Sequence, residues 1–552
     1  MPVPIMMLAS LDLTGDRSLE TRVCIIGAGA AGITLACELD GCGFDVLLIE
    51  AGSLRPDADL SDYYRGQATP PHPDPTQFRR AAFGGTTGLW GGRCVPFDPL
   101  DFGRRDHVVN SGWPISYQEV AQHYPRAMVY CDAGHFDFTV AGSLRDAIPT
   151  IGGFHGDGNV NADRIERYSL PTDFGTRYRR TIRESANVTA LLGARCLKLV
   201  KGAGEDRIDS IEVLGAGITR SVRAEIFVLA TGGIEVPRLL MLSDHAGMGF
   251  GNLSDHLGRY YMTHFENTCG RVVPHGVKVA FDFERTVDGV YSRRQLRFSP
   301  AALEQHRLLN TAFRLHFPAY SDARHGSSIM SGIYLAKSLL IPEYRAILQH
   351  NADAVSSPLR AHLRNVLMGL PQLSKFLASW LFRIKLARRK LPYTLVPNAD
   401  GSFPLEFNSE QTPLASNRVR LTSARDRHGL PRVQILWRLS EQDAEAAYRA
   451  LMLLRSSLNR SGACQLEFEE SQLRERLGRS TPLGGHHLGT ARMAATASGG
   501  VVDGNCAVFG LPNLFVASSA VFPTSSHANP TLTIVAMAVR LAAHLKARLG
   551  VP

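Results

Sequence analysis

One passage near the start of the chain, residues 21–52, limits the possible folds more than any other. An apolar run at Val23–Ile26 leads into GAGAAG and a helical stretch rich in Ala, and a second apolar run, Val46–Ile49, ends at Glu50. The G-x-G-x-x-G spacing is carried by Gly27, Gly29 and Gly32. Such glycines let the backbone approach a pyrophosphate closely, and the helix N-terminus supplies N–H donors. We therefore predict a dinucleotide-binding βαβ unit, rather than an ordinary βαβ turn, in which Glu50 accepts hydrogen bonds from a ribose hydroxyl.

The C-terminal part of the chain contains two histidine-bearing polar clusters, HHLGTARM at 486–493 and SSHANPTLT at 525–533. Between them, VVDGNCAVFGLPNLFVASSAVFP is typical of a strand, a turn and a second strand. That layout would bring His486 and Asn529, 43 positions apart, over one point in space. A histidine of near-neutral pKa can take a proton and an amide can donate a hydrogen bond, so the pair is a candidate catalytic site.

The length of 552 residues is too great for one compact core and predicts two domains. A hydrophobic content of 44% with 20% charged residues is ordinary for a soluble globular protein. The nine cysteines are scattered and form no C-x-x-C pair, which argues against a disulfide framework and a structural zinc site. Because neither a signal peptide nor a membrane-spanning run is recognisable, we expect a cytoplasmic protein without a metal ion.

The positive charge is concentrated between residues 354 and 399. This segment has no Asp or Glu, and its eight Lys and Arg residues account for nearly all of the net charge of +9. We interpret it as a helical insertion whose apolar face packs on its own domain. Peripheral contact with an anionic membrane or with a small partner subunit stays open as an alternative. Nucleic acid is not an expected partner, because no recognisable binding motif accompanies the charge.

The rest of the chain divides into two kinds of pattern. A second strand–glycine–helix passage occupies 224–243, whereas polar and apolar residues alternate through 270–345, as in antiparallel strands. Strands resume at FPLEFNSEQ and RVRLTSARDRHGLPRVQILWRLS, and a long helix follows at about 441–459. The predicted fold is an α/β dinucleotide-binding domain, discontinuous in sequence, with an antiparallel-sheet α+β domain inserted into it.

These motifs resemble those of the glucose–methanol–choline (GMC) family of flavin oxidoreductases. The resemblance rests on GAGAAG with Glu50, on GGTTGLWGG, on ATGGIEVPRLL with LGRYYMTH, and on HHLGTARM followed by VVDGNCAVFG and NLFVASSAVFPTSSHANPTLT. It implies a Rossmann-like FAD-binding domain and an inserted substrate-binding domain. The expected ranges are 15–140, 185–265 and 483–552 for the FAD-binding parts and 266–482 for the substrate-binding domain, with a basic helical insertion at 354–399.

The resemblance implies FAD as the cofactor. The residues expected to contact it are Gly27, Gly29, Gly32, Glu50, Gly85, Thr86, Trp90, Cys196, Ala230, Thr231, Ser518, Pro530 and Thr531. Leu89 stands where some sugar oxidases of the family attach FAD covalently through a histidine, so we expect non-covalent FAD. Ser518 stands where many members have Asp, so flavin contacts there could run through backbone groups.

In this family the catalytic histidine begins the pattern H-x-x-G-T, which falls on His486 and leaves His487 out of register by one. The second catalytic position falls on Asn529, with His527 nearby. Oxidising an alcohol removes a hydroxyl proton and a hydride from the same carbon. The resemblance implies that His486 takes the proton and flavin N5 the hydride.

The resemblance also implies oxidation of a secondary alcohol of a sugar or glycoside to the keto-sugar, as in bacterial members that resemble pyranose oxidase and glucoside 3-dehydrogenase. The predicted substrate contacts are Glu410, Gln411 and His527. Oxygen, a quinone or a carrier protein could reoxidise the flavin. Two other functions stay open: the flavoprotein subunit of a membrane- or cytochrome-linked alcohol or polyol dehydrogenase, and a lyase of the GMC fold. A non-enzymatic dinucleotide-binding module would not need His486 together with Asn529.

Overall fold

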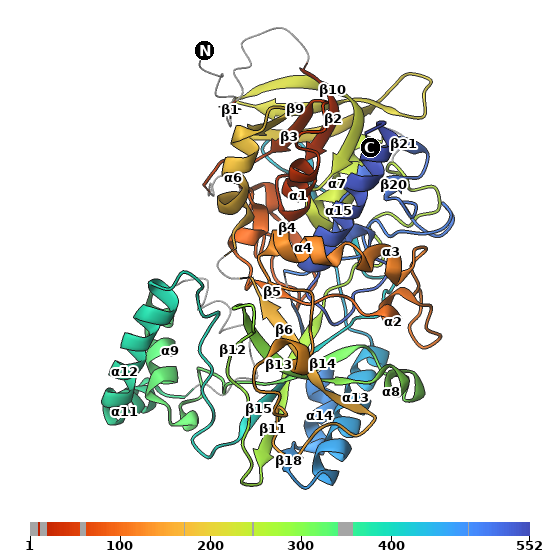
Figure 1. The fold of residues 1–552 in the computed structure, drawn as a ribbon. Helices are drawn as coiled ribbons and strands as arrows, with labels where there is room; N and C mark the ends of the chain where they lie inside the picture. The colour runs from red at the N-terminus through yellow and green to blue at the C-terminus, as the bar shows by residue number, and fades with distance from the viewer. Residues whose placement is uncertain are drawn as a thin grey trace.

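The computed structural model describes residues 9–10, 19–55, 62–169, 172–244, 248–340, 357–483 and 485–551. The beginning of the first predicted FAD-binding range, 15–18, and of the basic segment, 354–356, lie outside these residues. Within the described part of the chain, no helix is long and apolar enough to cross a membrane. Figure 1 shows two sheets, one above the other, with a group of helices standing beside the lower sheet.

A mainly parallel sheet of nine strands forms the upper part of the molecule in Figure 1. Its order is β1-β7-β3-β2-β10-β21-β20, and β8 and β9 join it beside β10. Its strands are β1 (Ala9–Ser10), β2 (Leu19–Ile26), β3 (Val46–Glu50), β7 (Val188–Leu192), β8 (Ala194–Lys201), β9 (Ile208–Gly215), β10 (Ile218–Leu229), β20 (Ala507–Val508) and β21 (Leu511–Val516). Because β7, β3, β2, β10 and β21 run parallel, their carboxyl ends meet along one edge.

The upper part of the molecule also contains helices. They are α1 (Ala30–Glu38), α2 (Pro99–Phe102), α3 (Tyr117–Ala121), α4 (Tyr124–Cys131), α6 (Phe174–Glu184), α7 (Gly232–Ser243) and α15 (Thr531–Arg548), with short 3₁₀ turns η2 (Gly85–Gly88) and η5 (Ser519–Val521). The two predicted strand–glycine–helix passages are β2–α1 and β10–α7. Apolar side chains from both strands and helices form one continuous core, which explains why β3 is buried along its whole length.

An antiparallel sheet forms the lower part of the molecule in Figure 1, with the order β18-β11-β15-β14-β13-β6-β5 and with β12 and β19 at its edges. Its strands are β5 (Arg93–Cys94), β6 (Val160–Tyr168), β11 (Phe265–Pro274), β12 (Glu284–Arg285), β13 (Tyr291–Phe298), β14 (Thr311–Leu315), β15 (Phe403–Ser409), β18 (Cys464–Glu467) and β19 (Thr481–Pro482). The antiparallel strands predicted for residues 270–345 are present as far as Leu315, but residues 328–340 form a helix and residues 341–345 lie outside the described part of the chain.

The two faces of the antiparallel sheet differ in chemistry. One face carries apolar side chains such as Phe313 and Phe407, which pack against Leu454 of a long helix. That helix, α13 (Glu441–Arg460), confirms the helix predicted at 441–459. Residues at alternate positions, such as Arg314 and Glu406, point to the opposite face. The sheet therefore has a charged face, which lies on the side of the cavity described below.

Several shorter elements complete the body of the molecule. They are α5 (Val140–Ser143), α8 (Pro300–Gln305), α14 (Glu470–Gly478), η3 (Ala323–His325) and a small three-stranded sheet made of β4 (Gly66–Ala68), β16 (Arg418–Arg425) and β17 (Pro431–Leu436). The turn between β16 and β17 reaches back to α7.

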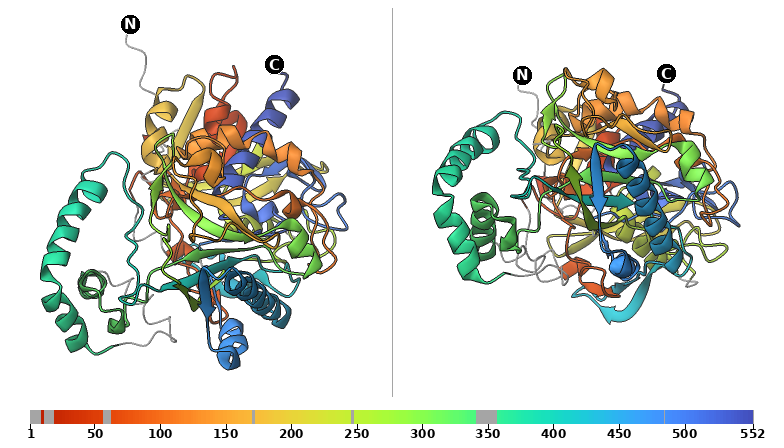
Figure 2. Two further views of the ribbon diagram at one scale, coloured as in Figure 1. Left: turned by 60° about the horizontal axis from the view of Figure 1, so that its bottom comes forward. Right: turned by 90° about the horizontal axis from the view of Figure 1, so that it is seen from below.

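Three helices inserted between β14 and β15 stand beside the body of the molecule in all views of Figures 1 and 2. They are α9 (Ser328–Leu340), α11 (Leu359–Met368) and α12 (Leu370–Trp380), and α12 continues into a π-helical turn at Leu381–Lys385. We call the described residues 328–340 and 357–390 the arm. The insertion was expected to pack its apolar face on its own domain. That expectation is wrong for α12, which has no buried residue and whose main contacts among the described residues are with the other elements of the arm.

Candidate active site

A cavity of about 730 Å³ lies between the carboxyl edge of the parallel sheet and the charged face of the antiparallel sheet. At one end it is lined by the turn after β2 and by Glu50, and at the other by residues of the antiparallel sheet such as Glu266 and Glu406. His486 and Asn529 both line it. The described residues contain no group of three or more His, Cys, Asp or Glu side chains arranged to hold a metal ion.

The glycine turn after β2 is shaped for close approach of a ligand. Gly27 has a φ of 106°, and a Cβ there would come within 2.7 Å of the Ala230 carbonyl oxygen. A Cβ on Gly32 would come within 1.9 Å of the Gly27 carbonyl oxygen, so this residue allows α1 to pack directly behind the turn. Any larger residue at either position would push the turn away from the strand end.

Glu50 lies at the same end of the cavity, as predicted. Its carboxylate accepts the Ala28 N–H at 3.0 Å and the Gly52 N–H at 2.8 Å, and burial raises its pKa to about 7. These two bonds fix the carboxylate beside the glycine turn. Each oxygen keeps a second lone pair, which a ribose hydroxyl could use.

Three helix N-termini surround the cavity, those of α1, α7 and α15. None of them is capped by a side chain, so their first N–H groups have no side-chain partner. Two buried side-chain oxygen atoms on the lining also lack a hydrogen-bond partner among the described residues, Thr231 Oγ1 and Asn529 Oδ1. Uncapped N–H groups favour an anionic ligand such as a pyrophosphate, and the two orphaned oxygens need donors. The residues present therefore fit a flavin dinucleotide.

The predicted cofactor contacts lie together on this lining. Twelve of the thirteen line the cavity: Gly27, Gly29, Glu50, Gly85, Thr86, Trp90, Cys196, Ala230, Thr231, Ser518, Pro530 and Thr531. The remaining one, Gly32, packs behind the turn. The Ser518 hydroxyl accepts the Ala520 N–H at 3.2 Å and so is used within the backbone of η5.

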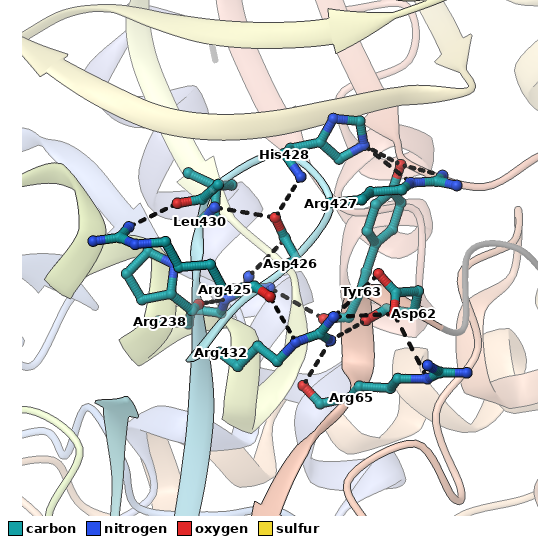
Figure 3. Close-up of polar contacts among 12 residues, drawn as sticks. Asp62, Tyr63, Arg65, Arg238, Arg425, Asp426, Arg427, His428, Leu430 and Arg432 are labelled. Carbon is teal, nitrogen blue, oxygen red and sulfur yellow. Dashed lines mark hydrogen bonds and ion pairs between the residues drawn. The ribbon is translucent and has the colours of Figure 1, made fainter. Parts of the chain in front are cut away.

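A cluster of charged side chains joins the β16–β17 turn to α7 and to the loop that carries Tyr63 (Figure 3), and Tyr63, Arg238 and Leu430 of this cluster line the cavity. Asp426, in the β16–β17 turn, accepts hydrogen bonds from Arg195 at 2.9 Å and from Arg238 of α7 at 3.2 Å. The Arg195 guanidinium lies 3.8 Å from the centre of the Tyr63 ring, and Arg427 donates to the Tyr63 hydroxyl at 3.1 Å. The β16–β17 turn is thus bound both to β8, which carries Arg195, and to the loop that carries Tyr63.

The structure brings His486 and Asn529 into direct contact, with the Asn529 amide nitrogen 3.1 Å from His486 Nε2. A third residue, His264, faces the other side of the ring, its Nδ1 2.6 Å from His486 Nδ1. His264 Nε2 in turn lies 3.0 Å from the Ser525 carbonyl oxygen. The four groups form one hydrogen-bonded chain.

The chemistry of these groups fixes where the protons are. The Ser525 carbonyl can only accept, so His264 Nε2 carries a proton. Burial lowers the pKa of His264 to about 4, so its Nδ1 is an unprotonated acceptor and His486 Nδ1 must donate to it. His486 Nε2 is therefore the unprotonated nitrogen that accepts the Asn529 N–H. Burial, and then the nearby His264, hold the pKa of His486 well below its usual range, lower than the near-neutral value expected from the sequence.

The charged face of the antiparallel sheet supplies the far wall of the cavity. Arg93 and Arg314 flank the buried Glu166, and Arg314 also donates to Glu406 at 2.7 Å. Glu266 has no hydrogen bond or ion pair with another described side chain, and burial followed by repulsion from Glu406 raises its pKa to about 7. Four aromatic rings complete this wall: Tyr168, Phe317, Tyr320 and Tyr393. Carboxylates and aromatic faces together suit a ligand with hydroxyl groups and apolar C–H faces.

The three predicted substrate contacts lie off the cavity lining, contrary to the expectation. Glu410 is fully buried in a bidentate ion pair with Arg105, and Gln411 accepts the Thr263 N–H at 3.0 Å. His527 is buried 3.7 Å from Asp98. Glu410 and Gln411 follow β15 directly and are fully buried, so their side chains bond within the protein rather than line the cavity. Of the neighbouring histidines, only His487 lines the cavity, where its ring stacks on Tyr261.

The sequence motifs did not identify His264, Glu266 or Glu406 as residues of the site. His264 and Glu266 are two positions apart in MTHFEN, so their side chains share a face when the segment is extended. Glu406 is the charged residue in the otherwise apolar stretch FPLEF. A charged side chain or an imidazole inside an apolar strand is the sequence signal that could have identified these residues.

Comparison with known proteins adds evidence independent of this geometry. Residues 413–538 match the sequence model of a family described as GMC oxidoreductase. The chain is 23% identical to 2-methyl-1,2-propanediol dehydrogenase of Mycolicibacterium austroafricanum, with 96% of each chain covered. It is 25% identical to paromamine 6'-oxidase of Streptomyces fradiae, with 96% of this chain and 92% of the relative covered. Identity reaches 36% to C-glycoside 3-oxidase of Microbacterium trichothecenolyticum, over 24% of each chain.

The fold is also found among solved structures. An FAD-dependent oxidoreductase from Chaetomium thermophilum superposes with a TM-score of 0.53 at 15% identity, covering 96% of this chain and all of that one. The match extends over both sheets, so the parallel and antiparallel sheets are arranged as in that enzyme. The chain thus resembles GMC oxidoreductases: its residues 413–538 match the family's sequence model, two relatives align over nearly its whole length, and its fold is that of an FAD-dependent oxidoreductase.

Proposed function

We propose that this protein oxidises a secondary hydroxyl of a sugar or glycoside to a ketone, with non-covalently bound FAD and with His486 as the base. The observation that carries the proposal is the unprotonated His486 Nε2, held in the cavity beside the Asn529 amide. A substrate hydroxyl that reaches both groups gives its proton to Nε2 and accepts a hydrogen bond from the amide. Bound FAD supplies the acceptor for the hydride that leaves the same carbon.

The surroundings of His486 support this role. His486 is neutral before the reaction, because burial disfavours its charged form, and so it can accept the hydroxyl proton. The resulting imidazolium donates through Nδ1 to His264, whose neutral ring accepts this charge-assisted hydrogen bond. Asn529 stabilises the negative charge that develops on the substrate oxygen. Removal of the proton and the hydride from the alcohol leaves a carbonyl group.

The walls of the cavity support a sugar as the substrate. Glu266 and Glu406 can each accept hydrogen bonds from hydroxyl groups, and Phe317, Tyr320 and Tyr393 offer aromatic faces. Two relatives act on glycosides by name, paromamine 6'-oxidase and C-glycoside 3-oxidase. The chain is 36% identical to C-glycoside 3-oxidase over 24% of its length.

The proposal is tested by mixing the purified yellow protein anaerobically with free sugars, glycosides and simple diols. We expect bleaching of the flavin's visible band with sugars or glycosides and the keto-sugar as product. Acid denaturation should release the flavin into the supernatant, because Leu89 cannot form the covalent link. Bleaching by diols alone would exclude a sugar substrate, and flavin that stays with the precipitated protein would exclude non-covalent binding.

His264 is expected to act as a positioning residue for His486. Substituting His264→Ala removes the acceptor of the Nδ1 proton, so kcat should fall about ten- to a hundredfold, the contribution of one hydrogen bond to a charged group. KM should change little, because His264 lies behind His486 relative to the cavity. His264→Gln, whose side-chain oxygen can accept the same bond, should restore part of kcat. A rise in KM without loss of kcat would contradict this role.

The ionisation of Glu266 should appear in the pH profile. Its pKa of about 7 means that it becomes a carboxylate as the pH rises through neutrality, and a carboxylate accepts stronger hydrogen bonds from sugar hydroxyls. We expect kcat/KM to rise about five- to tenfold from pH 6 to pH 8 and this rise to vanish in Glu266→Gln. Glu205→Gln, at an exposed turn, is the matched control. An unchanged profile in Glu266→Gln would show that another group titrates.

A further inference from the structure

The outer surface of the arm is unusually apolar for an exposed helical segment. Of the 20 large hydrophobic side chains that are exposed among the described residues, nine lie between residues 359 and 386. They are Leu359, Leu363, Leu367, Met368, Leu370, Leu377, Leu381, Phe382 and Leu386. Isolated exposed apolar residues are common, but a concentration of this kind marks a surface that binds something.

The arm helices hold one another by a different set of contacts. The Tyr334 ring of α9 stacks on His362 of α11 with the centroids 4.4 Å apart, and Asn365 donates to Ser331 at 3.2 Å. Leu373 of α12 packs against Gly332. Because these inner contacts keep the three helices together, the nine outer side chains are not needed to assemble the arm.

Positive charge lies among the exposed apolar residues. Six cations of the arm make no ion pair with another described residue: Arg360, Arg364, Lys375, Arg383, Arg388 and Lys390. A seventh, Arg389, binds Asp132 at 3.0 Å and ties the arm to the body. The sequence has no acidic residue from 354 to 399, so nothing within this stretch neutralises the cations.

We propose that the arm binds the surface of an anionic membrane. Lipid headgroups satisfy unpaired Lys and Arg side chains, while the layer just beneath them accepts Leu and Phe side chains. A protein partner fits less well, because the centre of a protein interface is depleted of charge, whereas Arg364 and Lys375 lie among the apolar residues of the arm. The arm helices also stand apart from the body of the molecule, as Figure 2 shows.

Membrane binding would orient the cavity. The chain enters the arm after Phe317 and Tyr320 and leaves it before Tyr393, and all three rings line the cavity. A membrane-bound arm therefore holds the charged wall of the cavity near the lipid surface. Binding of the arm to a lipid surface does not depend on which sugar the cavity accepts.

The test is co-sedimentation of the full-length holoenzyme with vesicles of phosphatidylcholine, alone or mixed with phosphatidylglycerol. We expect binding to the mixed vesicles only, weakened by salt. Leu367→Asn with Phe382→Asn should reduce binding at least about tenfold, since both side chains are about two-thirds exposed (68% and 66%). Arg364→Gln with Arg383→Gln should reduce it roughly fivefold for each cation removed.

The matched control is Leu253→Asn with Val287→Asn, two side chains of similar exposure (66% and 56%) outside the arm. It should bind like the wild type, and all variants should keep the wild-type flavin spectrum and melting temperature. No binding to the mixed vesicles, or equal loss in the control, would overturn the proposal. So would a wild-type dimer in solution that the Leu367→Asn, Phe382→Asn variant dissociates, because the arm would then be an interface between two copies of the chain.

Discussion

Replacing His486 with Ala is expected to slow reduction of the flavin by the sugar about 10²- to 10⁴-fold, the usual contribution of a general base. The loss should fall on kcat, because the imidazole acts when the hydroxyl proton leaves rather than when the sugar binds. Anaerobic stopped-flow bleaching of the flavin measures this step directly. Added imidazole should restore part of the rate by occupying the space that the substitution leaves.

His487 provides the control for this prediction. It lies next to His486 and also lines the cavity, but its ring stacks on Tyr261 and is not part of the chain from Asn529 to Ser525. We expect His487→Ala to change the rate of bleaching less than about tenfold, because it removes no proton acceptor. Undiminished bleaching in His486→Ala, or an equal loss in both variants, would refute the assignment of His486 as the base.

Replacing Asp426 with Ala is expected to destabilise the protein by about 3–5 kcal/mol, because it leaves buried cations unpaired. Arg195 loses its carboxylate partner, and Arg238 keeps Glu235, at 3.2 Å, as its remaining ion-pair partner among the described residues. The β16–β17 turn also loses the carboxylate oxygen that accepts the His428 and Leu430 N–H groups. Since Arg195 and Leu430 line the cavity, the variant should also release FAD more readily.

Chemical denaturation followed by flavin fluorescence and by circular dichroism would measure both effects. Asp209→Ala is the control, because Asp209 pairs with Arg223 at 3.2 Å where both side chains are exposed. Exposed pairs contribute less than about 1 kcal/mol, so this variant should unfold close to the wild type. A comparable shift in the two variants would show that the cluster in Figure 3 stabilises the fold no more than a surface ion pair does.

Much of the fold could be predicted from local patterns. The glycine turn and Glu50 could be identified because strand, turn, helix and acid occur within thirty residues, and such short-range signals survive in any tertiary context. The helix at 441–460 could be predicted for the same reason. The exposure of the arm could not be predicted, because an apolar helical pattern indicates that one face of a helix avoids water but does not indicate what covers that face.

The residues of the candidate site also divide into those that local patterns could predict and those that they could not. His486 and Asn529 could be proposed from the sequence because each lies in its own motif. His264 was missed because it contacts His486 across 222 positions of the chain. Glu410 was assigned to the substrate because it follows a strand, but its direction depends on Arg105, 305 positions away. Contacts over such separations depend on how the two sheets are placed, which no local pattern records.

The uncapped starts of α1, α7 and α15 have a consequence for how the protein folds. A side-chain cap stabilises a helix by about 1 kcal/mol, and all three helices lack one where they meet the cavity. A dinucleotide bound in the cavity would supply acceptors to these uncapped N–H groups, in the way that serine or aspartate does at other helix ends. Binding of FAD is therefore expected to raise the stability of the folded protein, and removal of FAD to lower its melting temperature.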